Sequence, residues 1–85
     1  MAYSIKWDNR AYKELKELET KDAINILNNV NKLYENPYSS GSNLKGKFKN
    51  KMRLRIGDFR LIYWIEEKEK TVWIIAIGLR KEIYK

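Results

Sequence analysis

The spacing of apolar residues in this 85-residue chain changes near its midpoint. Residues 51–56, Lys-Met-Arg-Leu-Arg-Ile, alternate strictly between basic and apolar side chains, which is the pattern of a β-strand with one buried face. Upstream of Pro37, apolar residues recur every three or four positions, as they do on one face of a helix. A chain of this length has room for one domain, so both kinds of element must share one core. The sequence therefore predicts an α+β fold in a single domain over residues 1–85.

We expect the first half to contain one strand and a helical hairpin. Alternation over residues 3–7 predicts a short strand, and Asp8 is placed to cap the helix that follows. A second helix, capped by Thr20, is expected to run to the residue before Pro37, because proline lacks an N–H and restricts the residue before it. Residues 37–43 have the composition of a loop.

The second half predicts a meander of strands. The last strand is almost continuously apolar, which is typical of a strand with neighbours on both sides and both faces covered. Residues 45–50 add either a further strand or an irregular entry to the sheet. The predicted order is β-α-α-β-β-β(β), with the helical hairpin packed on one face of a small, mainly antiparallel sheet. The strands are expected at residues 51–56, 59–65 and 71–77, joined by turns at 57–58 and 66–70, with Gly78 ending the last strand.

Composition excludes several kinds of chemistry. The chain has neither His nor Cys, so it has no thiolate nucleophile, no disulfide and none of the ligands that zinc prefers. No metal and no cofactor are expected. The N-terminus has no apolar signal core, and no run approaches the roughly 18 apolar residues of a membrane span. Together with the lack of Cys, this predicts a cytoplasmic protein that does not bind membranes.

The positive charge is concentrated in one part of the chain. The formal net charge is +7, and it divides into zero over residues 1–40, +6 over 41–60 and +1 over 61–85. Surfaces that serve only solubility usually mix both signs. A window of one sign indicates a polyanionic partner such as RNA, DNA or an acidic protein.

The basic residues of the alternating strand have two interpretations. Lys51, Arg53 and Arg55 are expected on one strand face, about 6.6–7 Å apart, where their charges repel one another. They either protect an edge strand from aggregation or bind a row of phosphates. Arg60, after the turn, is either a surface arginine, an ion-pair partner of Asp58 or a further phosphate ligand.

The same segments resemble those of the RelE/ParE toxin superfamily. In that superfamily a pattern close to L-x-G, then y-R-l-R-x-G-d-y-R-l-i-Y, is followed by an apolar strand and G-x-R…Y. The corresponding segments here are residues 43–46 (NLKG), 51–63 (KMRLRIGDFRLIY) and 77–84 (IGLRKEIY). The resemblance covers essentially the whole chain and implies a RelE-like, microbial ribonuclease-type fold. It also implies the toxin of a type II toxin–antitoxin system.

The resemblance to RelE-type members implies a metal-independent endoribonuclease that cleaves mRNA in the ribosomal A site and inhibits translation. Cleavage would proceed by attack of the substrate's 2′-OH on the adjacent phosphate. Arginine suits stabilisation of the phosphorane because guanidinium pairs with phosphate bidentately, and Lys51 or Tyr84 would be the base. The implied catalytic residues are Lys51, Arg53, Arg60, Arg80 and Tyr84. The remaining basic residues expected to bind RNA are Lys45, Lys47, Lys49, Arg55 and Lys81.

The resemblance also implies partners and leaves alternatives open. An acidic, RelB-like antitoxin is expected to wrap the toxin and neutralise its basic window, and DNA would be contacted only through that antitoxin. The first alternative is a ParE-like inhibitor of DNA gyrase without nuclease activity. The second is a small basic binding module with no catalysis.

Overall fold

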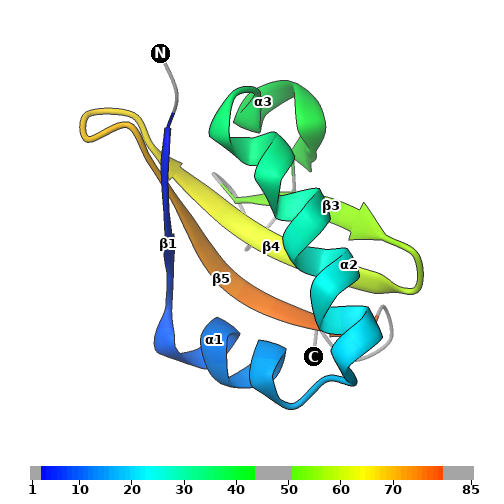
Figure 1. Ribbon diagram of the computed structural model, residues 1–85. Helices are drawn as coiled ribbons and strands as arrows, with labels where there is room; N and C mark the ends of the chain where they lie inside the picture. The colour runs from blue at the N-terminus through cyan, green and yellow to red at the C-terminus, as the bar shows by residue number, and fades with distance from the viewer. Residues whose placement is uncertain (1–2, 44–50, 80–85) are drawn as a thin grey trace.

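The computed structural model describes residues 3–43 and 51–79 of the chain, and Figure 1 shows its elements. In chain order they are β1 (Ser4–Trp7), α1 (Asn9–Lys16), α2 (Thr20–Val30), the 3₁₀-helix η1 (Asn31–Tyr34), α3 (Pro37–Ser40), β2 (Ser42–Asn43), β3 (Met52–Ile56), β4 (Phe59–Glu66) and β5 (Thr71–Leu79).

The described strands form one mixed sheet in the order β1-β5-β4-β3-β2. Strands β2 to β5 pair with antiparallel neighbours, and β1 lies parallel to β5. Two parallel strands need a long connection between them. The helices and strands between β1 and β5 form that connection here. The predicted α+β class and the mainly antiparallel sheet are therefore confirmed. The apolar β5 lies between β1 and β4, as its composition predicts.

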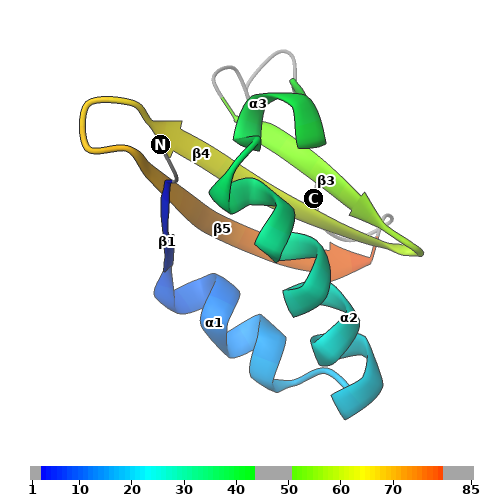
Figure 2. The ribbon, with the colours of Figure 1, turned by 45° about the horizontal axis from the view of Figure 1, so that its top comes forward.

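The core lies between the sheet and the helices, which cover one of its faces (Figures 1 and 2). Alternation in β3 sends Met52, Leu54 and Ile56 into this core and leaves Arg53 and Arg55 exposed on the opposite face. The carboxylate of Glu14 on α1 also accepts a hydrogen bond from the backbone N–H of a β5 residue, at 2.9 Å. The buried core residues are Ala11, Ile26, Val30, Leu33, Met52, Leu54, Ile56, Leu61, Tyr63, Val72, Ile74 and Ile77.

The helical half differs from its prediction in detail. Asp8 caps α1 as predicted, and its side chain accepts from the backbone N–H of Arg10 at 3.3 Å. The prediction for Thr20 was wrong by one position, because Glu19 is the N-cap of α2 and Thr20 is its first helical residue. The second helix is also shorter than predicted: α2 ends at Val30 and continues as the tighter η1. A 3₁₀ turn at the end of an α-helix is common.

Two segments contain more regular secondary structure than the sequence predicts. The predicted loop over residues 37–43 contains α3 and β2, because proline at the first helical position already has a suitable φ and needs no hydrogen-bond acceptor for its nitrogen. The last strand does not end at Gly78: β5 continues to Leu79 because both residues still pair with β4. The further strand that was considered at residues 45–50 lies outside the described residues.

Candidate functional site

Three arginines lie close together on the face of the sheet opposite the helices. The turn at Gly57, whose φ is +60°, places Arg55 directly opposite Arg60 in the β3–β4 register. Arg53 lies two residues from Arg55 on the same strand face. Residues paired across a sheet share a face and have Cβ atoms about 4.5–5.5 Å apart, so like charges at such positions destabilise the sheet. We call Arg53, Arg55 and Arg60 the arginine cluster.

Arg60 is the buried member of this cluster. Only 5% of it is exposed, whereas Arg53 and Arg55 are exposed. Its partner in the β4–β5 register is Gly78, which has no side chain. The surface position considered for Arg60 is therefore wrong. The ion pair with Asp58 is also not formed, since the ion pairs among residues 3–43 and 51–79 involve other side chains.

A cavity of about 260 Å³ opens beside the arginine cluster. Its volume lies just below the range of about 300–1,000 Å³ that is typical of small-molecule sites. Guanidinium groups only donate hydrogen bonds and remain charged, so the arginine side of the cavity is suited to an anion. The described residues that line it are Ser40, Gly41, Ser42, Arg53, Leu54, Arg55 and Arg60.

The structure brings together only part of the predicted site. Arg53 and Arg60, predicted as catalytic, line the cavity together with Arg55, which was predicted to bind RNA. Lys51 is half-buried just before β3 and is not among the lining residues. Six further predictions lie outside the described residues: Lys45, Lys47, Lys49, Arg80, Lys81 and Tyr84.

The other wall of the cavity, Ser40–Ser42, was missed by the sequence analysis. The buried Tyr63 hydroxyl, from β4, donates to the backbone carbonyl of Pro37 at 2.5 Å and so holds α3 against the sheet. Burial raises the pKa of Tyr63 to about 12, because the charged phenolate would be desolvated there. Gly41 lies so close that an added Cβ would come within 2.5 Å of the Arg53 carbonyl oxygen and closer still to the Tyr63 hydroxyl. The only sequence signal for this wall was the small-residue composition of the segment.

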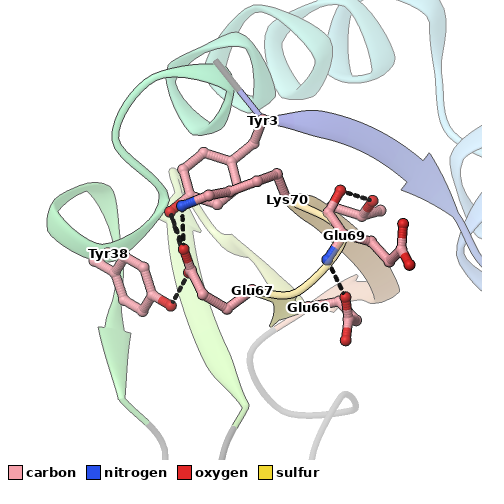
Figure 3. A network of polar contacts seen from close by, with 7 residues as sticks. Tyr3, Tyr38, Glu66, Glu67, Glu69 and Lys70 are labelled. Atoms are coloured by element: carbon pink, nitrogen blue, oxygen red, sulfur yellow. Dashed lines mark hydrogen bonds and ion pairs between the residues drawn. The ribbon is translucent and has the colours of Figure 1, made fainter. Parts of the chain in front are cut away.

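A second tyrosine connects α3 to the β4–β5 turn (Figure 3). The Tyr38 hydroxyl donates to the carboxylate of Glu67 at 2.5 Å, and this hydrogen bond raises the pKa of Tyr38 to about 12. Glu67 also accepts from Lys70 and, at 3.2 Å, from Tyr3. These hydrogen bonds, led by that from Lys70, lower the pKa of Glu67, and the Glu67 carboxylate in turn raises the pKa of Lys70. Glu67 thus joins the N-terminal segment, α3 and the turn.

A second hollow, of about 380 Å³, has the opposite charge. It lies between the turn of the helical hairpin, the start of β4 and the end of β5. Its lining includes Glu14, Glu17, Glu19 and Asp22. Four carboxylates repel phosphate. Of these two hollows, only the cavity at the arginine cluster suits a nucleic acid.

The described residues show neither a metal site nor a membrane span. Within residues 3–43 and 51–79, no group of three or more metal-ligating side chains is placed to hold an ion. None of the helices in this part of the chain has the length and apolar character needed to cross a bilayer.

Comparison with known proteins gives one family and several relatives. Residues 5–84 match the family described as the ParE toxin of the parDE type II toxin–antitoxin system. The mRNA interferase toxin RelE of Escherichia coli K12 is 29% identical over 87 aligned positions, which cover 99% of this chain and 92% of that protein. A putative RelE-like toxin protein of Escherichia coli is 28% identical, covering 95% of this chain and 86% of that protein.

Solved structures share the fold. The toxin–antitoxin complex RelBE2 of Mycobacterium tuberculosis contains a chain that superposes with a TM-score of 0.87 at 22% identity, covering 94% of this chain and all of that one. The isolated RelE toxin of E. coli superposes with a TM-score of 0.82 at 24% identity, covering 98% of this chain and 92% of that one.

Proposed function

We propose that this chain, which belongs to the ParE toxin family of type II toxin–antitoxin systems, is a ribosome-dependent mRNA endonuclease of the RelE type. The observation that carries the proposal is the buried Arg60 beside Arg53 and Arg55, at the edge of a cavity of about 260 Å³. Three guanidinium groups in this arrangement repel one another until an anion lies between them. An RNA phosphate is such an anion.

The proposed reaction needs no water and no metal. The 2′-oxygen of the substrate attacks the adjacent phosphorus, the bond to the 5′-oxygen breaks, and a 2′,3′-cyclic phosphate forms. A base takes the proton of the 2′-hydroxyl, and an acid returns a proton to the departing 5′-oxygen. The arginine cluster would stabilise the extra negative charge of the phosphorane, a contribution that in other enzymes amounts to about 10²–10³-fold for one donor. Lys51, Arg80 and Tyr84 remain the proposed further members of the catalytic set.

Two observations favour RNA cleavage over gyrase inhibition. The relatives named above, at 28–29% identity over nearly the whole chain, carry the RelE name, and one is named an mRNA interferase toxin. The arginine cluster lines a cavity and not a flat surface, which suits one sugar–phosphate unit held in a defined geometry. The family match itself carries the ParE name and keeps gyrase as the second candidate.

The proposed partners follow from the family and from charge. Toxins of this kind are paired with an antitoxin, and solved relatives include RelBE complexes. An acidic antitoxin would neutralise the basic window over residues 41–60, whose net charge is +6. The ribosomal A site and its mRNA would be the target in the cytoplasm, and DNA would be contacted through the antitoxin.

The test is cleavage of mRNA on programmed ribosomes, with Arg60→Ala compared with Arg10→Ala. Arg10 is a matched control because it is an exposed arginine on α1, away from the cavity. We expect cuts within the A-site codon, only when ribosomes are present, with 2′,3′-cyclic phosphate ends. Arg60→Ala should slow cleavage about 10²–10³-fold, and Arg10→Ala should not slow it.

Because Arg60 is buried, the exposed Arg53→Ala is tested in parallel, and urea unfolding shows whether each variant is folded. Intact mRNA together with inhibited supercoiling by purified gyrase would replace the proposal with the ParE-like function. Intact mRNA with active gyrase would leave only a binding module. Full cleavage by folded Arg60→Ala and Arg53→Ala would refute the role of the arginine cluster.

A further inference from the structure

The cavity at the arginine cluster has two chemically different walls. Arg53, Arg55 and Arg60 form one wall and donate hydrogen bonds only. The Ser40–Ser42 segment forms the other, and a serine hydroxyl both donates and accepts. Among the described lining residues, serines are therefore the only side chains able to accept a hydrogen bond.

Ser42 is the serine of this wall that belongs to a strand. It pairs with Arg53 in the β2–β3 register, so its side chain lies on the same face of the sheet as the arginine cluster. Ser42 is exposed, which leaves its hydroxyl accessible to a ligand.

Contacts on the core side of the sheet fix the position of the Ser40–Ser42 wall. Tyr63 anchors the carbonyl of Pro37, at the start of α3. Gly41 packs against both the Tyr63 hydroxyl and the backbone of Arg53, in a space that admits no Cβ. Ser42 follows Gly41 directly, so the packing of Gly41 against Tyr63 and Arg53 fixes the distance between Ser42 and the arginine cluster.

The chemistry of the walls matches that of one RNA unit. A phosphate oxygen only accepts hydrogen bonds, and the guanidinium groups satisfy it. A ribose 2′-hydroxyl is a donor as well as an acceptor, and it is the group by which a protein distinguishes RNA from DNA at a given position. We infer that Ser42 accepts a hydrogen bond from the ribose 2′-hydroxyl next to the phosphate held by the arginine cluster, and so makes the cavity select RNA over DNA. This rests on the proposed function, since it takes the bound anion to be a nucleic-acid phosphate.

The test measures binding of fluorescein-labelled RNA and DNA oligonucleotides of the same sequence by fluorescence anisotropy, without ribosomes. Wild type is expected to bind RNA more tightly. Ser42→Ala should reduce the ratio of RNA to DNA affinity about three- to tenfold, the effect of one neutral hydrogen bond, while leaving DNA affinity unchanged. Gly41→Ala should reduce the ratio as well, because the added methyl displaces the wall. Ser39→Ala is the matched control, since Ser39 is exposed on α3 and does not line the cavity.

The outcomes separate this inference from the proposed function. Equal binding of RNA and DNA by wild type, or an unchanged ratio in Ser42→Ala, overturns the role of Ser42. Either result leaves ribosome-dependent cleavage and its dependence on Arg60 standing. Reduced affinity for RNA and DNA alike in Ser42→Ala also overturns it, because the hydroxyl would then bind phosphate and not ribose.

Discussion

Replacing Tyr63 with phenylalanine removes one oxygen from the point where α3 is fixed to the sheet. Tyr63 is fully buried, and its hydroxyl donates to the Pro37 carbonyl at 2.5 Å. Tyr63→Phe leaves that buried carbonyl without its partner, which costs about 1–3 kcal/mol, and the phenol no longer needs to be desolvated. We expect the free energy of unfolding to fall by about 1–2 kcal/mol. For a domain of this size, each kcal/mol lowers Tm by about 4–8 °C.

The pH dependence of stability gives a more specific test of the same group. Burial raises the pKa of Tyr63 to about 12, against an unfolded value near 10. The neutral phenol therefore stabilises the folded state at every pH below about 10, and this contribution is lost as the pH rises from 10 to 12. Two pKa units correspond to about 2–3 kcal/mol. The raised pKa values of Tyr38 and Lys70 lower the stability of both proteins alike at high pH. Wild type should lose this much more than Tyr63→Phe in that window, so their stability curves should cross there.

The assay is urea unfolding at a series of pH values from 7 to 12, with Tyr12→Phe as the control. Tyr12 is 53% exposed, so loss of its hydroxyl should change stability by less than about 0.5 kcal/mol. Curves for wild type and Tyr63→Phe that run parallel from pH 10 to 12 would refute the argument from burial. An unchanged urea midpoint at pH 7 would refute the argument from the hydrogen bond.

Two further predictions concern the core and the Glu67 contacts. Leu33 is fully buried on η1, so Leu33→Ala should lower the free energy of unfolding by about 2–5 kcal/mol in urea titrations, and a loss below 1 kcal/mol would contradict its place in the core. Because the hydrogen bond from Lys70 lowers the pKa of Glu67, this carboxylate stabilises the fold above its ordinary titration range and stops doing so as the pH falls through the lowered pKa. NMR titration should find a lowered pKa for Glu67, and Glu67→Gln should make stability less dependent on pH on the acid side. Titration of Glu67 in the ordinary range of a glutamate would disprove the hydrogen bond from Lys70.

The position of Arg55 beside Arg60 follows from local sequence. Alternation in β3 determines which face each residue occupies, and a two-residue turn at Gly57 determines the register of the hairpin. Together they place the two arginines opposite each other. Both features are present in the sequence, which predicts Arg55 as an RNA-binding residue. The structure adds that Arg55 lies opposite the buried Arg60.

The burial of Arg60 and the serine wall depend on contacts between distant parts of the chain. Gly78 lies beside Arg60 only because β5 continues past the point where its apolar run ends. The hydrogen bond from Tyr63 to Pro37 joins residues 26 positions apart, and Gly41 lies close to the same Tyr63 hydroxyl. The composition of residues 37–43 predicts a loop, because local propensity carries no information about which distant residues pack against this segment.

The chemistry of the arginine cluster bears on why cleavage would need the ribosome. Guanidinium groups stabilise charge but do not exchange protons near neutral pH, and the chain contains no histidine. The described part of the cavity is therefore suited to binding an anion and to hydrogen bonding, without a general base tuned to neutral pH. Under the proposed function, the substrate brings its own nucleophile, and the ribosome holds the mRNA in line with the leaving oxygen. Positioning alone can supply about 7–11 kcal/mol of the barrier reduction, so a toxin of 85 residues can rely on its target for geometry and contribute charge.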